Sequence, residues 1–352
     1  MSAIRQIRYR QVTRAMRTVF ATSLGRKSVA TSVLVKVILT DGEQGEGEVP
    51  TSFVLPHETP EAIKSILDQA ARELAGAAID DYPDRLARLS GRFGDFHMTL
   101  SGLEVALFRA QLAARGAGEH AFWGGMLCRL ETDITVPFLP RRPMREAWLR
   151  RIAPVGFTAY KVKVSGDVEK DIRFVRAVRR TLLGSLKGPF VIRLDGNQGY
   201  TARTYLRMLD RLEREGIEIE LFEQPLKQDD FAGYRRIRGR SRAPLVLDET
   251  VFTAADCRRV IEQGLGDGVN IKIAKSGIAE SGAILKMAKA AGLKLMIGCM
   301  TETMVGLSAG ILMAAGTGAF DYVDLDSAHL LHADRRRRGI VVDGRSYVIE
   351  GA

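Results

Sequence analysis

The sequence predicts an α/β protein in which a smaller α+β domain precedes a closed barrel of eight parallel strands. From about residue 130, short β-rich runs alternate with amphipathic stretches, and several of these runs end in a charged residue. Strand–helix–strand units of this kind build a parallel sheet with right-handed crossovers. Eight such units within roughly 200 residues fit a modified TIM-type (β/α)8 barrel better than an open doubly wound sheet.

The predicted strands are rich in apolar and β-branched residues. In chain order they are ITVPFL (134–139), TAYKVKV (158–164), FVIRLD (190–195), IELFE (219–223), PLVLD (244–248), VNIKI (269–273), LKLMIG (293–298) and DYVDLD (321–326). Between them, stretches such as 167–184 and 279–292 place apolar residues at steps of three and four, which is the period of a helix with one buried face. We therefore expect the barrel domain over residues 126–326.

The first 125 residues follow a different pattern. Residues 32–39, SVLVKVIL, alternate in polarity, and the run DGEQGEGE with its turn glycines follows, which favours an antiparallel hairpin or meander. Helical patterns over 59–76 and around 101–116 complete an α+β capping domain, residues 1–125. The tail, residues 327–352, carries a hairpin pattern around Asp343-Gly344, and we expect this tail to return to the capping domain.

The composition excludes several classes of protein. Hydrophobic residues make up 46% and charged residues 27% of the 352 residues, as in ordinary globular proteins. No apolar run approaches the roughly 20 residues that a membrane span needs, and the N-terminal residues lack the apolar segment of a secretory signal. The three cysteines are scattered, without metal-ligand spacing, which favours a reducing compartment. We therefore expect a cytoplasmic protein.

The net charge of +10 suggests nucleic-acid binding as a hypothesis. The basic residues are mostly spread along helix faces, with local clusters at 235–242 and 335–338, and no nucleic-acid-binding motif accompanies them. A solvated basic surface that attracts acidic small molecules explains the charge better. We expect no nucleic-acid partner and no membrane partner.

Three carboxylates end the third, fourth and fifth predicted strands. They are Asp195, Glu223 and Asp248. In a barrel of this type the functional side chains lie at the carboxyl ends of the strands, so all three converge on one side of the mouth. Three like charges need a cation, and hard oxygen ligands suit Mg²⁺. Any one of them alone would more simply cap the next helix. Asn197 and Glu249 are candidate supporting partners.

Lysines occupy the second and sixth strands. Lys161 and Lys163 are two residues apart and share the interior face, and Lys272 ends strand six. Adjacent ammonium groups lower each other's pKa, which makes a lysine a usable base. A pair of surface lysines on an edge strand is the alternative, but a barrel has no edge. Strands two and six lie opposite each other in an eight-stranded barrel, so Lys163 and Lys272 would face each other across the mouth.

This geometry predicts a reaction. A substrate carboxylate held by Mg²⁺ would place its α-carbon between two amines, so that one lysine removes the α-proton and the other returns a proton to the opposite face. Such an arrangement suits racemisation or epimerisation. Asp324 and Asp326, two apart on strand eight, face the metal across the barrel and would suit a substrate ammonium group. Alternatively, these aspartates bind loop amides.

Seven motifs lie between about residues 132 and 326: TAYKVKV, RLDGNQGY, LFEQPL, LVLDET, NIKIAKSG, GCMTET and DYVDLD. Together they resemble the enolase superfamily, muconate-lactonizing subgroup, and within it the dipeptide epimerases. The resemblance implies that Lys163 and Lys272 are the acid/base pair and that Lys161 tunes Lys163. It also implies that Asp195, Glu223 and Asp248 bind one Mg²⁺ per subunit. The DLD part of the last motif implies that Asp324 and Asp326 hold the N-terminal ammonium of a dipeptide.

The resemblance extends to the substrate pocket. It implies that Thr135 and the segment Cys299, Met300, Thr301 and Glu302 line the pocket, and that a loop near residues 20–30 closes over the substrate. In L-Ala-D/L-Glu epimerases a basic residue of this loop meets the glutamate side chain. Here Gly25 takes that position with Arg26 beside it, so Arg26 is the candidate specificity residue. An Ala-Glu dipeptide, as in murein peptide recycling, is the leading substrate, and we expect a homo-oligomer.

Two alternatives remain open. A cycloisomerase or o-succinylbenzoate synthase of the same superfamily would use the same lysines but would not need the aspartate pair. A non-catalytic anion-binding or nucleic-acid-binding protein would require the lysines and carboxylates to be vestigial, although the whole set is present.

Overall fold

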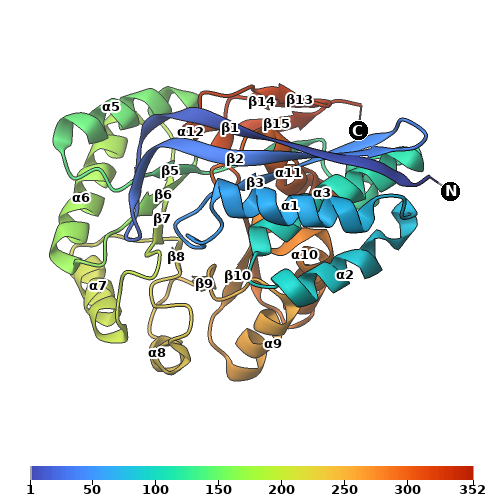
Figure 1. The fold of residues 1–352 in the computed structure, drawn as a ribbon. Coiled ribbons are helices and arrows are strands. Elements are labelled where there is room, and N and C mark those ends of the chain that lie inside the picture. The colour runs from blue at the N-terminus through green and yellow to red at the C-terminus, as the bar shows by residue number, and fades with distance from the viewer. Residues whose placement is uncertain (1, 352) are drawn as a thin grey trace.

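The protein was analysed as a computed structural model, which describes residues 2–351. Its strands form three sheets: a three-stranded antiparallel sheet at the N-terminus, an eight-stranded parallel sheet, and a four-stranded sheet that includes the C-terminus. Figure 1 shows the long N-terminal strands lying across the barrel, with helices around its outside. This arrangement confirms the predicted fold class of a modified barrel with a capping domain.

The capping domain is a three-stranded meander packed on helices. Its strands are β1 (Ile4–Ala21), β2 (Arg26–Leu39) and β3 (Gln44–Pro50), and its helices are α1 (Pro60–Leu74), α2 (Tyr82–Phe93), α3 (His97–Ala114) and α4 (Glu119–Phe122), with a 3₁₀ turn at Ile79–Asp81. Thr59 caps α1 by accepting the Ala62 N–H, and Pro60 supplies a fixed φ at its first position.

Two glycines of the GEGE run have a different role from the predicted turn. Gly45 and Gly47 lie inside β3, and a Cβ at either position would come within 2.0 Å of a backbone oxygen of α3. Helix α3 is buried on nearly all sides, because it packs between this sheet and barrel helix α10. The glycines therefore permit the close contact that joins the capping domain to the barrel.

All eight predicted barrel strands are present. They are β5 (Ile134–Val136), β6 (Ala159–Lys163), β7 (Val191–Asp195), β8 (Leu221–Glu223), β9 (Leu245–Leu247), β10 (Gly268–Ile271), β11 (Lys294–Gly298) and β12 (Tyr322–Asp324), each parallel to its neighbours in chain order. The Asp133 N–H donates to the Val323 carbonyl at 3.1 Å, which brings the first and last strands together. The barrel is thus nearly closed.

Helices follow the strands in the predicted alternation. They are α5 (Arg142–Ile152), α6 (Val168–Ser185), α7 (Ala202–Arg214), α8 (Phe231–Ile237), α9 (Ala254–Gln263), α10 (Ile273–Ala290), α11 (Met304–Thr317) and the single turn α12 (Ser327–Leu330), with a 3₁₀ turn at Ala153–Val155. Helix α10 is kinked at Gly277, whose φ of 72° is left-handed. Among residues 2–351, no helix is long and apolar enough to cross a membrane.

The C-terminal tail forms the predicted hairpin, with strands β14 (Ile340–Asp343) and β15 (Ser346–Ile349). Strand β13 (Arg336–Arg337) pairs with β14, and β15 pairs with β4 (Arg129–Glu131), just before the barrel. Arg337 forms an ion pair with Glu46 of β3. The tail therefore contacts the capping domain and also pairs with the strand that enters the barrel.

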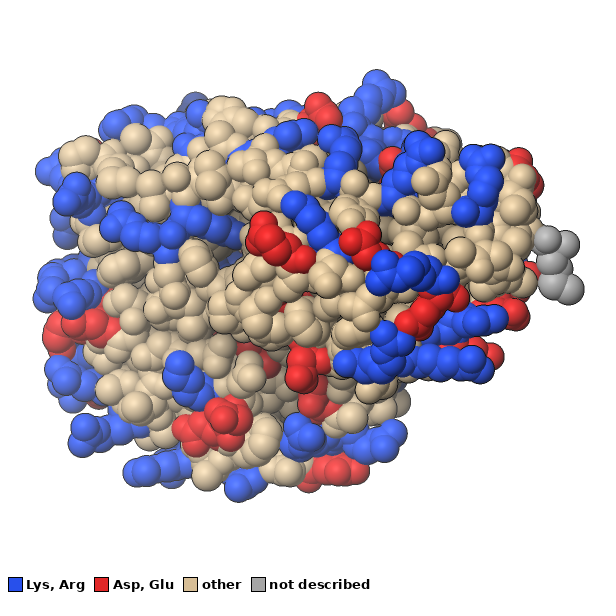
Figure 2. Space-filling model, viewed as in Figure 1, with Lys and Arg blue, Asp and Glu red and all other residues tan. Residues whose placement is uncertain are grey.

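Basic residues cover the visible face of the molecule without forming one continuous patch. In Figure 2, Lys and Arg side chains are distributed around the whole outline, with Asp and Glu side chains interspersed and a broad uncharged area near the centre. Several of the exposed arginines have nearby acidic partners, such as Arg129 with Asp343 and Arg207 with Glu169. This distribution fits the expectation of a solvated basic surface.

Candidate active site

A narrow cavity of about 80 Å³ lies at the barrel mouth, beneath the turn between β1 and β2. The turn is attached to the barrel, because the Ser23 hydroxyl donates to the Asn197 carbonyl at 2.5 Å. The side chains that line the cavity come from both domains and include Lys161, Lys163, Asn197, Asp248, Glu249, Lys272, Asp324 and Asp326. The capping domain thus forms the roof, and the strand ends form the floor and walls.

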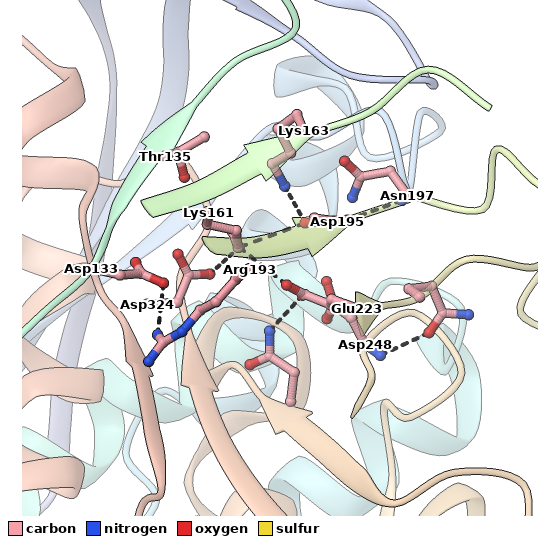
Figure 3. A network of polar contacts seen from close by, with 12 residues as sticks. Asp133, Thr135, Lys161, Lys163, Arg193, Asp195, Asn197, Glu223, Asp248 and Asp324 are labelled. Atoms are coloured by element: carbon pink, nitrogen blue, oxygen red, sulfur yellow. Dashed lines mark hydrogen bonds and ion pairs between the residues drawn. The ribbon is translucent and has the colours of Figure 1, made fainter. Parts of the chain in front are cut away.

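Lys161 is at the centre of a buried charge network. Its Nζ lies 3.3 Å from Glu223 Oε2 and 3.6 Å from Asp195 Oδ2, and it also donates to Asp324. Lys163 donates to Asp195. Figure 3 shows both lysines pointing from β6 toward the carboxylates of the neighbouring strands. All of these side chains are at most 5% exposed, so their charges interact with little screening by water.

A second pair of lysines surrounds Asp248 on the opposite side. Lys272 Nζ and Lys275 Nζ each lie 2.6 Å from an oxygen of this carboxylate, and Lys275 also donates to the Val251 carbonyl at 3.0 Å. Sequence analysis missed Lys275. It follows Lys272 by three residues at the start of α10, where such residues share a helix face, so this spacing could have revealed it.

The pKa values of Lys161 and Lys272 are both raised above the ordinary value of a lysine. Burial by itself lowers the pKa of Lys161, but Asp324 and Glu223 outweigh it, and the pKa lies well above the ordinary value. The same holds for Lys272, where Asp248 opposes the effect of burial and the pKa is raised. For Lys161, the lowering expected from an adjacent ammonium group is therefore outweighed, because the carboxylates beside this lysine favour its charged form.

The three predicted metal ligands lie at the ends of adjacent strands. Asp195, Glu223 and Asp248 are at most 2% exposed. Burial, with Asp195 beside it, raises the pKa of Glu223 to about 7. Burial also raises the pKa of Asp195 and of Asp248, but neighbouring lysines outweigh it and lower both. Among these three ligands, Glu223 is therefore the one whose negative charge the surroundings disfavour.

A divalent cation fits this donor set. The site and the layer beneath it contain seven buried carboxylates and five buried cationic groups, which leaves two negative charges when all are ionised. The carboxylates are Asp133, Asp195, Glu223, Asp248, Glu249, Asp324 and Asp326, and the cationic groups are Lys161, Lys163, Arg193, Lys272 and Lys275. Oxygens of Asn197 and Glu249 are buried without a hydrogen-bond partner. Buried, unpartnered oxygens and excess negative charge are the features that Mg²⁺ satisfies.

Another group of carboxylates lies on the β12 side. Asp133, Asp324 and Asp326 each offer an oxygen within 4.8 Å of the others. All three carboxylates already have partners: Arg193 pairs with Asp133 at 2.8 Å, Asp326 accepts the Thr135 N–H at 2.6 Å, and Lys161 donates to Asp324. Figure 3 shows Arg193 reaching toward Asp133 beneath Asp324.

Sequence analysis missed Asp133 and Arg193. Arg193 could have been found, because it precedes Asp195 by two residues on β7 and therefore shares its face. Asp133 precedes β5 in an unremarkable loop position, and no local pattern marks it.

The remaining residues predicted to line the pocket divide into two groups in the structure. Thr135, Cys299, Met300 and Thr301 line the cavity. Glu302 does not, because its carboxylate turns back to accept the Met300 N–H at 2.7 Å.

Arg26 is also outside this cavity. It is exposed and lines a separate pocket beside Arg141 and Met144. The neighbouring Lys27 enters the active-site cavity instead, because successive residues of β2 point to opposite faces of the strand. The candidate for a basic specificity residue therefore moves by one position.

Comparisons with known proteins show the family of this chain. A family model described as "Enolase C-terminal domain-like" matches residues 143–351. The aromatic dipeptide epimerase of Herpetosiphon aurantiacus is 33% identical over 309 residues, 88% of this chain and 85% of that protein. A substrate-liganded complex of the L-Ala-D/L-Glu epimerase from Bacillus subtilis superposes with a TM-score of 0.90 at 28% identity, over 99% of this chain and 96% of the other.

A dipeptide epimerase from Cytophaga hutchinsonii, solved with Mg and the dipeptide D-Ala-L-Val, gives a TM-score of 0.89 at 26% identity, over 99% of this chain and 93% of the other. The similarity in both comparisons spans the capping domain as well as the barrel.

Proposed function

The chain belongs to the enolase superfamily and is an isomerase of its dipeptide epimerase group. We propose that it inverts the C-terminal residue of a dipeptide by a two-lysine, Mg²⁺-dependent proton transfer. One observation carries the proposal. Lys163 on β6 and Lys272 after β10 come from strands four steps apart in an eight-stranded barrel, yet both line the same cavity. Two amines on opposite sides of one substrate are what inversion at an α-carbon requires.

Asp195, Glu223 and Asp248 would hold the Mg²⁺ ion, one per subunit. When bound, the ion supplies positive charge that stabilises the negative charge developing on the substrate carboxylate. A Mg²⁺ ion held by these carboxylates would also compete with the ammonium groups of Lys163 and Lys272 for Asp195 and Asp248. The contacts of both lysines with these ligands support a site in which the base nitrogens lie close to the reacting carbon.

The lysines exchange roles with the direction of the reaction. For one epimer the neutral Lys163 takes the α-proton and the Lys272 ammonium returns a proton to the opposite face; for the other epimer the roles reverse. Lys161 acts as a positioning residue, because it connects Asp195 and Glu223 to Asp324. Which face of the carbon each lysine serves defines the stereochemical outcome.

Asp324 and Asp326 would bind the ammonium group of the dipeptide. Both are buried at the end of β12 and line the cavity, and Asp324 Oδ1 has no hydrogen-bond partner. Burial raises the pKa of Asp326 to about 6, so a cationic substrate group would relieve an unfavourable buried charge. This requirement favours a dipeptide over the substrates of cycloisomerases and o-succinylbenzoate synthases, which would not need an aspartate pair.

An acidic second residue, as in L-Ala-D/L-Glu, is the leading substrate. Lys27 is the basic group that the capping domain contributes to the cavity, and its Nζ donates to Thr301 Oγ1 at 2.6 Å. Burial lowers the pKa of Lys27 to about 8, and a substrate carboxylate beside it would stabilise its charge. We also propose that the enzyme acts in the cytoplasm on murein-derived peptides, as a homo-oligomer.

The test is deuterium incorporation from D₂O into pooled L,L-dipeptides in the presence of Mg²⁺, followed by mass spectrometry. We expect a one-dalton gain in dipeptides with a free N-terminus, greatest for those ending in Glu or Asp. Lys27→Met should shift the preference from acidic to neutral dipeptides, whereas Lys36→Met, a partly exposed lysine of the same strand, should not. No labelling in any pool would contradict the epimerase assignment.

A further inference from the structure

A second and larger cavity lies on the side of the barrel away from α5–α7. Its volume is about 650 Å³, compared with about 80 Å³ at the active site. Helix α3 forms its floor, and α2 and α10 form its sides; Figure 1 shows α2 and α10 beside each other at the lower right. A cavity of this size is typical of sites that hold a small organic ligand.

The walls of the second cavity are largely aromatic and aliphatic. They include Tyr82, Leu86, Leu100, Phe108, Phe122, Phe252 and Ile278. Phe122 is 54% exposed, an unusually large exposure for this side chain. An aromatic body would gain contact area on several sides in such a space.

Two polar groups in this cavity retain hydrogen-bonding capacity. Ser276 is 9% exposed, and its Oγ has no hydrogen-bond partner. Glu104 is 6% exposed and accepts the N–H groups of Ile278 and Ala279 at 2.9 and 3.0 Å. A carboxylate can accept about four hydrogen bonds, so roughly two sites of Glu104 remain free. Both groups can therefore accept hydrogen bonds from a ligand.

The charges around the cavity favour a cation. Glu104 and Glu280 line it, while burial lowers the pKa of His97 and so disfavours the charged form of that ring. Lys275 also lines the cavity, but its ammonium is occupied by Asp248 and nearby carbonyl oxygens. Among the described residues that line the cavity, Lys275 is the one lysine or arginine. A positively charged ligand would therefore meet two carboxyl groups, and its charge would favour the ionised form of Glu104, whose pKa burial raises to about 7.

Lys275 connects this cavity to the active site. It lines both cavities, and its Nζ lies 5.1 Å from the centre of the Phe252 ring, which forms part of the wall of the second cavity. A ligand that moves the Phe252 ring would change the packing around Lys275 and therefore around Asp248. The two cavities thus share one side chain that contacts a candidate metal ligand.

We propose that the cavity between α2, α3 and α10 is an effector site for a small aromatic compound carrying a cationic amine. The aromatic body would pack against Phe108, Phe122 and Phe252, and the amine would donate to Glu104 and Ser276. Occupancy would reach the active site through Lys275.

Tryptamine is the probe, and indole-3-propionate is its matched control, with the same ring and a carboxylate in place of the amine. We expect saturable binding of one tryptamine per chain by calorimetry, much weaker binding of the propionate, and a several-fold change in the epimerisation rate with tryptamine. Leu86→Trp should fill the cavity and abolish both effects, whereas Leu183→Trp, an exposed leucine on α6, should abolish neither. Ser276→Ala, a smaller change, should weaken binding several-fold.

Tryptamine could instead occupy the proposed ammonium site, and Asp324→Asn separates the two positions. Binding that persists in Asp324→Asn and disappears in Leu86→Trp supports the effector site. Any of four results would overturn the effector site. They are loss of binding in Asp324→Asn, unchanged binding in Leu86→Trp, no saturable binding to the wild-type chain, and binding without a change in the epimerisation rate. The rate measurement rests on the proposed function, but calorimetry does not, so failure of one can be distinguished from failure of the other.

Discussion

The two sides of the barrel mouth contain the same parts, but they are supported differently. On one side Lys163 contacts Asp195, with Lys161 as a second lysine; on the other Lys272 contacts Asp248, with Lys275 as the second. Lys161 on β6 reaches Asp324 on β12, two strands away around the barrel, and its polar contacts are with side chains. Lys275, at the start of α10, also donates to the backbone carbonyl oxygens of Asp248, Val251 and Asn270.

This difference gives the two proposed bases, Lys163 and Lys272, different surroundings. The Lys163 side is connected to the carboxylates that would bind the substrate ammonium. The Lys272 side is connected to the backbone and, through α10, to the capping domain. We therefore expect changes near Lys161 to affect substrate recognition, and changes near Lys275 to affect stability.

Removal of the metal should have the largest effect, because it disables both sides equally. Treatment with EDTA followed by thorough dialysis should abolish exchange of both epimers, and Mg²⁺ should restore it, since the charge developing on the substrate carboxylate would otherwise be unstabilised. Deuterium exchange measured before and after Mg²⁺ addition checks this. Full activity after EDTA would rule out the metal role of Asp195, Glu223 and Asp248.

The Asp324→Asn substitution should have the second-largest effect on activity, and it should weaken substrate binding more than it slows the proton transfer. Loss of a buried charged partner for the substrate ammonium should lower kcat/KM on the order of 10²-fold. The measurement compares free and N-acetylated dipeptides. If the wild-type enzyme accepts N-acetylated dipeptides as well as free ones, the ammonium assignment is wrong.

Lys275→Met should reduce stability on the Lys272 side. Removing one partner of a buried ion pair typically costs about 3–5 kcal/mol, and here it also leaves the Val251 and Asn270 carbonyl oxygens without this donor. Urea unfolding checks the loss. Lys286→Met, an exposed lysine on the same helix, is the control and should change the free energy of unfolding by less than about 0.5 kcal/mol. Equal effects of the two variants would contradict the role of Lys275 as an anchor.

The pH dependence of stability should show the smallest effect. Burial raises the pKa of Glu104 from 4.5 to about 7, so the folded chain binds this proton more tightly than the unfolded chain. The stability contributed by this group is fully present below pH 4.5 and is lost as the pH rises to about 7, which amounts to at most about 3 kcal/mol. Glu104→Gln should flatten that part of the stability profile in unfolding experiments. An unchanged profile would show that Glu104 does not titrate there.

Much of the barrel could be predicted because its signals are local. Each strand is a short apolar run, and several of these runs end in a charged residue, which located Asp195, Glu223 and Asp248 at adjacent strand ends. The period of two within a strand placed Lys161 and Lys163 on one face. Counting strands placed Lys272 opposite Lys163.

The features that were missed depend on the exact register or on contacts between distant segments. Arg26 and Lys27 differ by one position, and only the pairing of β1 with β2 decides which enters the cavity. Gly45 and Gly47 resemble turn residues until α3 is packed against them. The expected pKa lowering of Lys161 considered the neighbouring ammonium group alone, whereas the folded chain places Asp324 in contact with Lys161.

Deuterium exchange of each separate epimer of one dipeptide, in the Lys163→Ala and Lys272→Ala variants, tests the central claim most directly. Loss of a general base typically lowers the rate 10²–10⁴-fold. We predict that Lys163→Ala loses exchange from one epimer by about 10³-fold while exchange from the other is much less affected, and that Lys272→Ala shows the reverse. Equal residual exchange from both epimers in both variants would contradict a mechanism in which each lysine serves one face of the α-carbon.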